Sequence, residues 1–186
     1  MKEKEERILH LGKILTRITI GIGVLSIVFP ILFWKQIPEQ ISMHFGADGV
    51  MDRMGDKSEL ILLFFVILFL MGMMGIVIYY VKTNAMSQYA KEKASLTTIY
   101  PMLVMMNFFL MCGFAYMVFC AVTVRNLGVL FMPIFLIATF APLVYYLWKD
   151  GKIRRELEKQ MGDYRAYEKT AEGEVYRAHM DSGFRM

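Results

Sequence analysis

The sequence has almost no charge over four long stretches. Hydrophobic residues make up 56% of the 186-residue chain, and charged residues make up 20%. Four apolar runs contain no Asp, Glu, Lys, Arg or His apart from Arg17, and they lie at about residues 14–34, 60–81, 99–124 and 129–148. An apolar run of about 18 residues or more is long enough to cross a bilayer as a helix. We therefore predict an all-α, polytopic membrane protein with four transmembrane helices.

The same absence of charge argues against two classes of function. Proton-coupled transporters and intramembrane enzymes usually need ionisable groups deep in the membrane. The apolar runs offer neutral polar side chains instead, and Asn107 is the most polar of them. We expect Asn107 to form a hydrogen bond between helices. We predict that the protein is not an enzyme and has no catalytic residues.

Cysteine and histidine are also scarce. The two cysteines, Cys112 and Cys120, lie in one apolar run, about 12 Å apart along a helix, which is too far for a disulfide. Seventeen methionines could act as soft copper ligands, but methionine is also a flexible apolar side chain. No histidine lies within the runs. We therefore predict no cofactor and no metal in the membrane.

Basic residues are distributed unevenly between the segments that flank the apolar runs. Most of the 21 Lys and Arg residues fall in the N-terminal segment, the second connection and the tail. Cytoplasmic segments carry the excess of Lys and Arg in membrane proteins. We therefore place both termini in the cytoplasm and the first loop outside it. The net charge of +4 then reflects topology and attraction to a lipid bilayer with anionic headgroups, and we predict no nucleic-acid partner.

The chain divides by composition into a membrane domain, residues 1–148, and a basic cytoplasmic tail, residues 149–186. Apolar residues recur at helical spacing over residues 152–161, which predicts an amphipathic cytoplasmic helix. The last fifteen residues show no periodicity, and we expect disorder there. The tail contains Arg155-Glu156-Leu157, followed by Met161-Gly162-Asp163-Tyr164 and Tyr167. This pattern is similar to the end of isoprenylcysteine-type membrane methyltransferases, but the tail lacks the Arg-His-Pro signature that helps those enzymes to hold the methyl donor.

The longest polar segment in the first half of the chain covers residues 35–58, between the first two apolar runs. His44, Asp48 and Asp52 recur there at intervals of four, and a histidine with two carboxylates could hold a divalent ion. Three glycines in the segment argue against a regular helix, so turns would have to bring these side chains together. Alternatively, the loop caps itself, with His44 and Lys57 paired to carboxylates over the helix ends. In both cases we predict an ordered extracytoplasmic loop.

The same segment resembles a known bacterial loop. The positions that match are Ile37, Pro38, Ile41, His44, Phe45, Gly49, Asp52 and Lys57. This pattern is similar to the bacterial family called domain of unknown function 1648. Two positions depart from it, because Ser42 replaces a proline and Met54 stands where an aromatic residue is usual.

The resemblance also carries an expectation about function. The same loop follows the first helix of SdpI-type immunity and signalling proteins, which protect a bacterium from its own killing peptide. It implies a non-enzymatic protein of the bacterial cytoplasmic membrane that senses or neutralises an extracytoplasmic peptide or toxin. The candidate contact residues are His44, Phe45, Asp48, Asp52 and Lys57. The basic tail would then hold or release a cytoplasmic regulator.

An alternative function belongs to a different class. Helices that lack charge and are rich in Met and Gly also suit a small subunit of a transport complex, packed against a larger permease. The partner would then be another membrane protein, and no soluble ligand would be needed.

Overall fold

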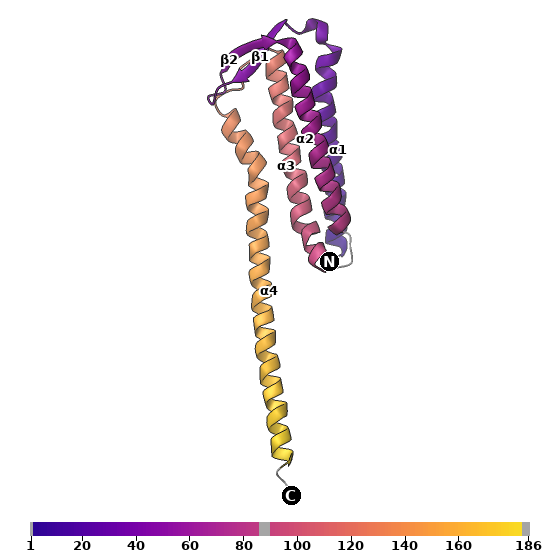
Figure 1. The fold of residues 1–186 in the computed structure, drawn as a ribbon, viewed down its shortest axis with the longest axis vertical. Coiled ribbons are helices and arrows are strands. Elements are labelled where there is room, and N and C mark those ends of the chain that lie inside the picture. The colour runs from indigo at the N-terminus through magenta and orange to yellow at the C-terminus, as the bar shows by residue number, and fades with distance from the viewer. Residues whose placement is uncertain (1, 86–89, 184–186) are drawn as a thin grey trace. The chain divides into compact units, whose positions relative to one another are not determined.

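The computed structural model describes residues 2–85 and 90–183, and most of these residues are helical (Figure 1). The four α-helices are α1 (Lys2–Leu32), α2 (Leu60–Ala85), α3 (Ala90–Val122) and α4 (Phe131–Gly183). The segment between α1 and α2 contains two strands, β1 (Gln40–Phe45) and β2 (Met51–Asp56). A short 3-10 helix flanks the strands on each side, η1 (Trp34–Gln36) and η2 (Lys57–Glu59).

Within residues 2–85 and 90–183, four helical segments are long and apolar enough to cross a membrane. They are Glu6–Leu32, Lys57–Thr83, Thr98–Val122 and Phe131–Lys152. Each overlaps one of the four predicted runs, which confirms a multi-pass, mainly helical membrane protein. The first helix begins at Lys2, well before the predicted span at residue 14, and the charged N-terminal segment forms its first turns.

The chain forms two compact units, Met1–Tyr146 and Leu147–Met186. The first contains α1 to α3, the strands and the beginning of α4. In the second, α4 continues to Gly183. The disorder that we expected for the last fifteen residues is therefore wrong for residues 172–183. Extending an existing helix avoids the cost of nucleation, and this favours helix where apolar periodicity is absent. Most side chains of the predicted amphipathic face, such as Ile153 and Leu157, lie outside the described residues.

Close packing between α1 and α3 depends on Gly12, and a second contact between the helices, at Gly23, has ordinary van der Waals length. A Cβ at Gly12 would lie 2.5 Å from the hydroxyl oxygen of Tyr100, and a Cβ at Gly23 would lie 3.6 Å from the sulfur of Met111. The two pairs have the same separation in sequence, so the helices run parallel (Figure 1). This register brings Thr19 of α1 to the level of Asn107 of α3.

Asn107 is buried in this interface, with 4% of its surface exposed. Its carboxamide oxygen has no hydrogen-bond partner within the described residues, so the predicted bond between helices is not made through this oxygen. Thr19 is fully buried at the same level, but its hydroxyl donates to the carbonyl oxygen of Leu15 at 2.8 Å. Threonine in a helix commonly donates its hydroxyl proton to the carbonyl four residues earlier. The Thr19 hydroxyl therefore does not donate to Asn107.

The polar segment between α1 and α2 is a β-hairpin, and these strands were not predicted from the sequence. Strands β1 and β2 pair antiparallel, with two irregularities in the register between Ser42 and Phe45. Gly49, with a φ of 71°, closes the turn by donating to the carbonyl oxygen of Gly46 at 2.9 Å, and glycine adopts positive φ without strain. The irregular register hides the alternation of apolar residues by which strands are usually recognised.

The hairpin lies over the ends of α1, α2 and α3 (Figure 1). Ile37, just before β1, and Ile41, within β1, are buried in a core cluster with side chains from α2 and α3. The helical members of this cluster are Leu60, Phe64, Ile67, Met111, Val118 and Ala121. The hairpin therefore rests on the apolar core of the helices and gains stability from it.

Candidate functional site

The candidate site is the β1–β2 hairpin, and its second strand leads directly into α2 through a capped turn. The Asp56 carboxylate accepts a hydrogen bond from the amide of Ser58 at 2.7 Å, and the Asp56 amide donates to Glu59 at 3.2 Å. This is a reciprocal capping box, which satisfies backbone amides that have no partner within the helix. Hydrogen bonds from Ser58, with a smaller contribution from the charge of Lys57, lower the pKa of Asp56 below its ordinary value of 3.8.

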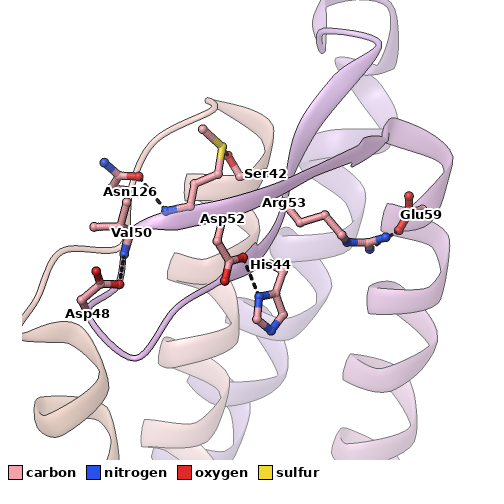
Figure 2. A network of polar contacts seen from close by, with 9 residues as sticks. Ser42, His44, Asp48, Val50, Asp52, Arg53, Glu59 and Asn126 are labelled. Atoms are coloured by element: carbon pink, nitrogen blue, oxygen red, sulfur yellow. Dashed lines mark hydrogen bonds and ion pairs between the residues drawn. The ribbon is translucent and has the colours of Figure 1, made fainter.

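The side chains of His44 and Asp52 contact one another across the two strands. The Nδ1 atom of His44 lies 2.6 Å from Oδ1 of Asp52, and Figure 2 shows the two side chains pointing toward one another. Both remain accessible, with 65% and 51% of the side chain exposed. Together they present a donor, an acceptor and opposite charges to a ligand when the imidazole is protonated.

Asp48 does not join this pair. It lies in the turn at the tip of the hairpin, where its carboxylate accepts a hydrogen bond from the amide of Val50 at 3.0 Å (Figure 2). Because that oxygen stabilises the turn, the three side chains at intervals of four do not converge. Among residues 2–85 and 90–183, the structure contains no group of three His, Cys, Asp or Glu side chains arranged to hold a metal ion.

Lys57 stabilises the base of the hairpin. Its ammonium group lies 2.7 Å from a carboxylate oxygen of Glu39 and 5.7 Å from the centre of the Trp34 ring. Only 14% of the Lys57 side chain is exposed, whereas 79% of the Glu39 side chain is exposed. Both pairings of the self-capping alternative are therefore present: His44 and Lys57 each contact a carboxylate. Lys57 is less accessible to a ligand than the His44–Asp52 pair.

Phe45, the fifth predicted contact residue, is half-buried at the end of β1. It pairs with Met51 of β2, next to the turn. Its ring therefore contributes partly to the packing of the tip, and only part of it is accessible.

Arg53 belongs to the exposed surface of the hairpin, although the sequence did not single it out. Its guanidinium nitrogen Nη2 lies 2.6 Å from Oε2 of Glu59 (Figure 2), and in the strand register Arg53 is opposite His44. Glu59 thus accepts from Arg53 with one oxygen and from the Asp56 amide with the other. The only signal in the sequence was a basic residue beside Asp52, which is too common to indicate a site.

Asn126 also contacts the hairpin, and it comes from the connection between α3 and α4. Its carboxamide oxygen accepts a hydrogen bond from the backbone amide of Met51 at 2.9 Å (Figure 2). This amide lies on the side of β2 that faces away from β1, so Asn126 covers part of a free strand edge. The two residues are 75 positions apart, and no local pattern could have predicted their contact.

An apolar groove lies between α1 and α2, and it includes Trp34 beside the hairpin. Its volume is about 400 Å³ and its lining is entirely apolar. The lining residues are Ile27, Ile31, Trp34, Ile61, Phe64, Phe65 and Leu68. Because Lys57 lies over the Trp34 ring, the groove and the charged hairpin meet at this tryptophan.

Comparison with known proteins supports the resemblance found in the loop. Residues 21–69 match the family described as "Domain of unknown function (DUF1648)", and this segment covers the C-terminal part of α1, the hairpin and the beginning of α2. An uncharacterized protein of Archaeoglobus fulgidus is 40% identical over 52 residues, which are 28% of this chain and 28% of that protein. No solved structure gives a significant match. The predicted family resemblance is therefore confirmed for this segment.

Proposed function

We propose that the protein is a non-enzymatic membrane protein of the SdpI-like immunity and signalling type, and that its hairpin engages an extracytoplasmic peptide. In this proposal it resides in a bacterial cytoplasmic membrane with both termini in the cytoplasm. The observation that carries the proposal is the accessible His44–Asp52 pair, with Arg53 beside it, on the hairpin that matches the DUF1648 family.

The hairpin is held in place at several points, which favours a binding role. Lys57 and the Asp56 capping box stabilise its base, Ile41 anchors it in the core, and Asn126 binds near its tip. A surface that is already ordered loses little conformational entropy when a ligand binds. His44, Asp52 and Arg53 are therefore presented in a preorganised arrangement.

The adjacent groove suggests the chemistry of the ligand. A peptide that is active on membranes has polar and apolar faces. Its charged side chains would pair with His44, Asp52 and Arg53, and an apolar side chain would enter the groove at Trp34. A single amphipathic segment could thus contact both surfaces at the membrane boundary. The basic tail would transmit the event by holding or releasing a cytoplasmic regulator.

A protection assay tests the proposal. Cells that express the protein are challenged with a membrane-active killing peptide of the kind that SdpI-type proteins neutralise, and survival is compared with cells that lack the protein. We expect His44→Ala and Asp52→Ala to reduce protection at unchanged membrane abundance. Met54→Leu is the matched control, because Met54 is an exposed, uncharged residue of the same strand. Full protection by both alanine variants would rule out the hairpin as the contact site.

A small subunit of a transport complex is a second candidate function. The observation in its favour is the large apolar surface of the first part of α4, where Ile137 and Val144 are 68% and 66% exposed. Such a surface suits either lipid or a larger membrane protein. Purification in mild detergent separates the two candidates, because stable co-purification with a permease supports the subunit and a lone protein supports the stand-alone receptor.

A further inference from the structure

The tip of the hairpin is bonded to the connection between α3 and α4, residues 123–130. The carbonyl oxygen of Gly49 accepts hydrogen bonds from the amides of Leu127 at 2.9 Å and Gly128 at 3.3 Å. Close by, the Asn126 side chain accepts from the amide of Met51 at 2.9 Å (Figure 2). Three hydrogen bonds thus link the turn of the hairpin to a segment that is distant in sequence.

Gly49 is necessary for this contact on steric grounds. A Cβ at this position would collide with the carbonyl oxygen of Gly128, and the φ of 71° is one that residues with a side chain rarely adopt. Backbone atoms on both sides of the contact leave no flexible side chain that could move away. The close approach therefore depends on glycine at this position.

The connection is attached to α3 and to α4 as well as to the hairpin. On the α3 side, the Tyr116 hydroxyl donates to the carbonyl oxygen of Leu127 at 3.3 Å, and the Arg125 amide donates to that of Cys120 at 2.9 Å. On the α4 side, the Phe131 amide donates to the carbonyl oxygen of Gly128 at 3.0 Å. Gly128 therefore bonds the hairpin through its amide and the start of α4 through its carbonyl.

The connection also contains an unfavourable backbone conformation. Val124 has a φ of 52°, which is uncommon and strained for a β-branched residue. Such a conformation persists only when surrounding contacts hold it. The hydrogen bonds to the hairpin and to α3 supply these contacts.

We propose that Gly49, Met51, Asn126, Leu127 and Gly128 form a latch through which the hairpin tip and the first turn of α4 order one another. A change at the hairpin then reaches α4 directly, without passing along α1 or α2. As a route for a ligand signal the latch rests on the proposed function, but the coupling is a property of the chain alone and is tested without a ligand.

Hydrogen exchange of the full-length protein in detergent micelles tests the coupling. Asn126→Ala removes the acceptor for the Met51 amide, and we expect exchange to rise roughly fivefold, the effect of one hydrogen bond, over both residues 46–52 and residues 125–134. Asn126→Asp retains an acceptor oxygen and should exchange more slowly than the alanine variant. Unchanged exchange over residues 104–118 of α3 confirms that the variants are folded.

A second pair of variants tests the steric part of the latch. Gly49→Ala should raise exchange in the same two segments, whereas Gly21→Ala should leave them unchanged because a Cβ at Gly21 meets nothing within 4 Å. Coupling between two sites is reciprocal, so loosening the connection from the α3 side with Tyr116→Phe should raise exchange over residues 46–52.

Two results would overturn the latch. One is an increase in hydrogen exchange in Asn126→Ala that is confined to residues 46–52, because α3 alone would then order the connection. The other is wild-type exchange over residues 46–52 in Tyr116→Phe. Neither result depends on peptide protection, so failure of the latch and failure of the proposed function are distinguishable.

Discussion

The imidazole of His44 on β1 and the carboxylate of Asp52 on β2 lie 2.6 Å apart, although both side chains are more than half exposed. An exposed polar pair of this kind contributes little to stability, because water already solvates both groups. The pair is therefore better suited to contact with a ligand than to holding the hairpin together.

This relationship predicts that substitutions of His44 or Asp52 impair function without destabilising the protein. We expect His44→Ala and Asp52→Ala to change the free energy of unfolding by less than about 1 kcal/mol. Denaturant unfolding in detergent measures the change. If either variant lost several kcal/mol, the pair would have a structural role, and a loss of protection could no longer be attributed to a lost contact.

Lys57 is expected to behave differently. Lys57→Ala removes the ion pair with Glu39 and the contact with the Trp34 ring, and we expect it to destabilise the protein by about 1–2 kcal/mol. Lys35→Ala is the matched control, since Lys35 is an exposed lysine of the neighbouring turn. Thermal unfolding of both variants checks the difference, and equal midpoints would contradict a stabilising role for Lys57.

The Asp56 capping box predicts a dependence on pH. Because hydrogen bonds from Ser58 lower the pKa of Asp56 in the folded state below 3.8, the cap stabilises η2 at pH values above the ordinary pKa. This contribution is lost as the pH falls through the lower, folded-state pKa. Protection of the Ser58 amide, corrected for intrinsic exchange, should therefore fall in this acidic range in the wild-type protein. Asp56→Asn keeps an acceptor oxygen and should remove the pH dependence.

Packing of α1 on α3 predicts a contrast between two glycines of α1. Gly12→Ala places a methyl group against the Tyr100 side chain, and we expect a loss of about 1–3 kcal/mol from overpacking. Gly21→Ala meets open space and should be neutral or slightly stabilising, because alanine favours helix over glycine. Thermal midpoints of the two variants provide the comparison, and an equal response would argue against the close contact at Gly12.

Asn107 predicts an unusual response to an apolar substitution. Its carboxamide oxygen is buried without a partner in the part of the chain that the structure describes, and replacing such a group with an apolar one of similar size can be neutral or stabilising. We expect Asn107→Leu to retain or raise the thermal midpoint. A clear loss of stability would show that the oxygen has a partner in the assembled protein, such as a second subunit.

Several features of the fold and of the site could be predicted from the sequence. The four membrane-crossing helices and the DUF1648 resemblance depend on local composition and on positions a few residues apart. The pairing of His44 and Lys57 with carboxylates was one of two alternatives, and an ion site formed by His44, Asp48 and Asp52 was the other. The hairpin itself was not predicted, because its irregular register removes the alternation of apolar and polar residues that indicates a strand.

The sequence by itself determined that this chain crosses a membrane, because the length of an apolar run is sufficient for a helix to span the bilayer. It also determined where polar chemistry is concentrated, since charge is nearly absent from the spans. Only the tertiary structure decided that His44 faces Asp52 while Asp48 caps the turn, and that Asn126 reaches Met51. These choices depend on strand register and on packing between residues up to 75 positions apart, neither of which is encoded in any local segment.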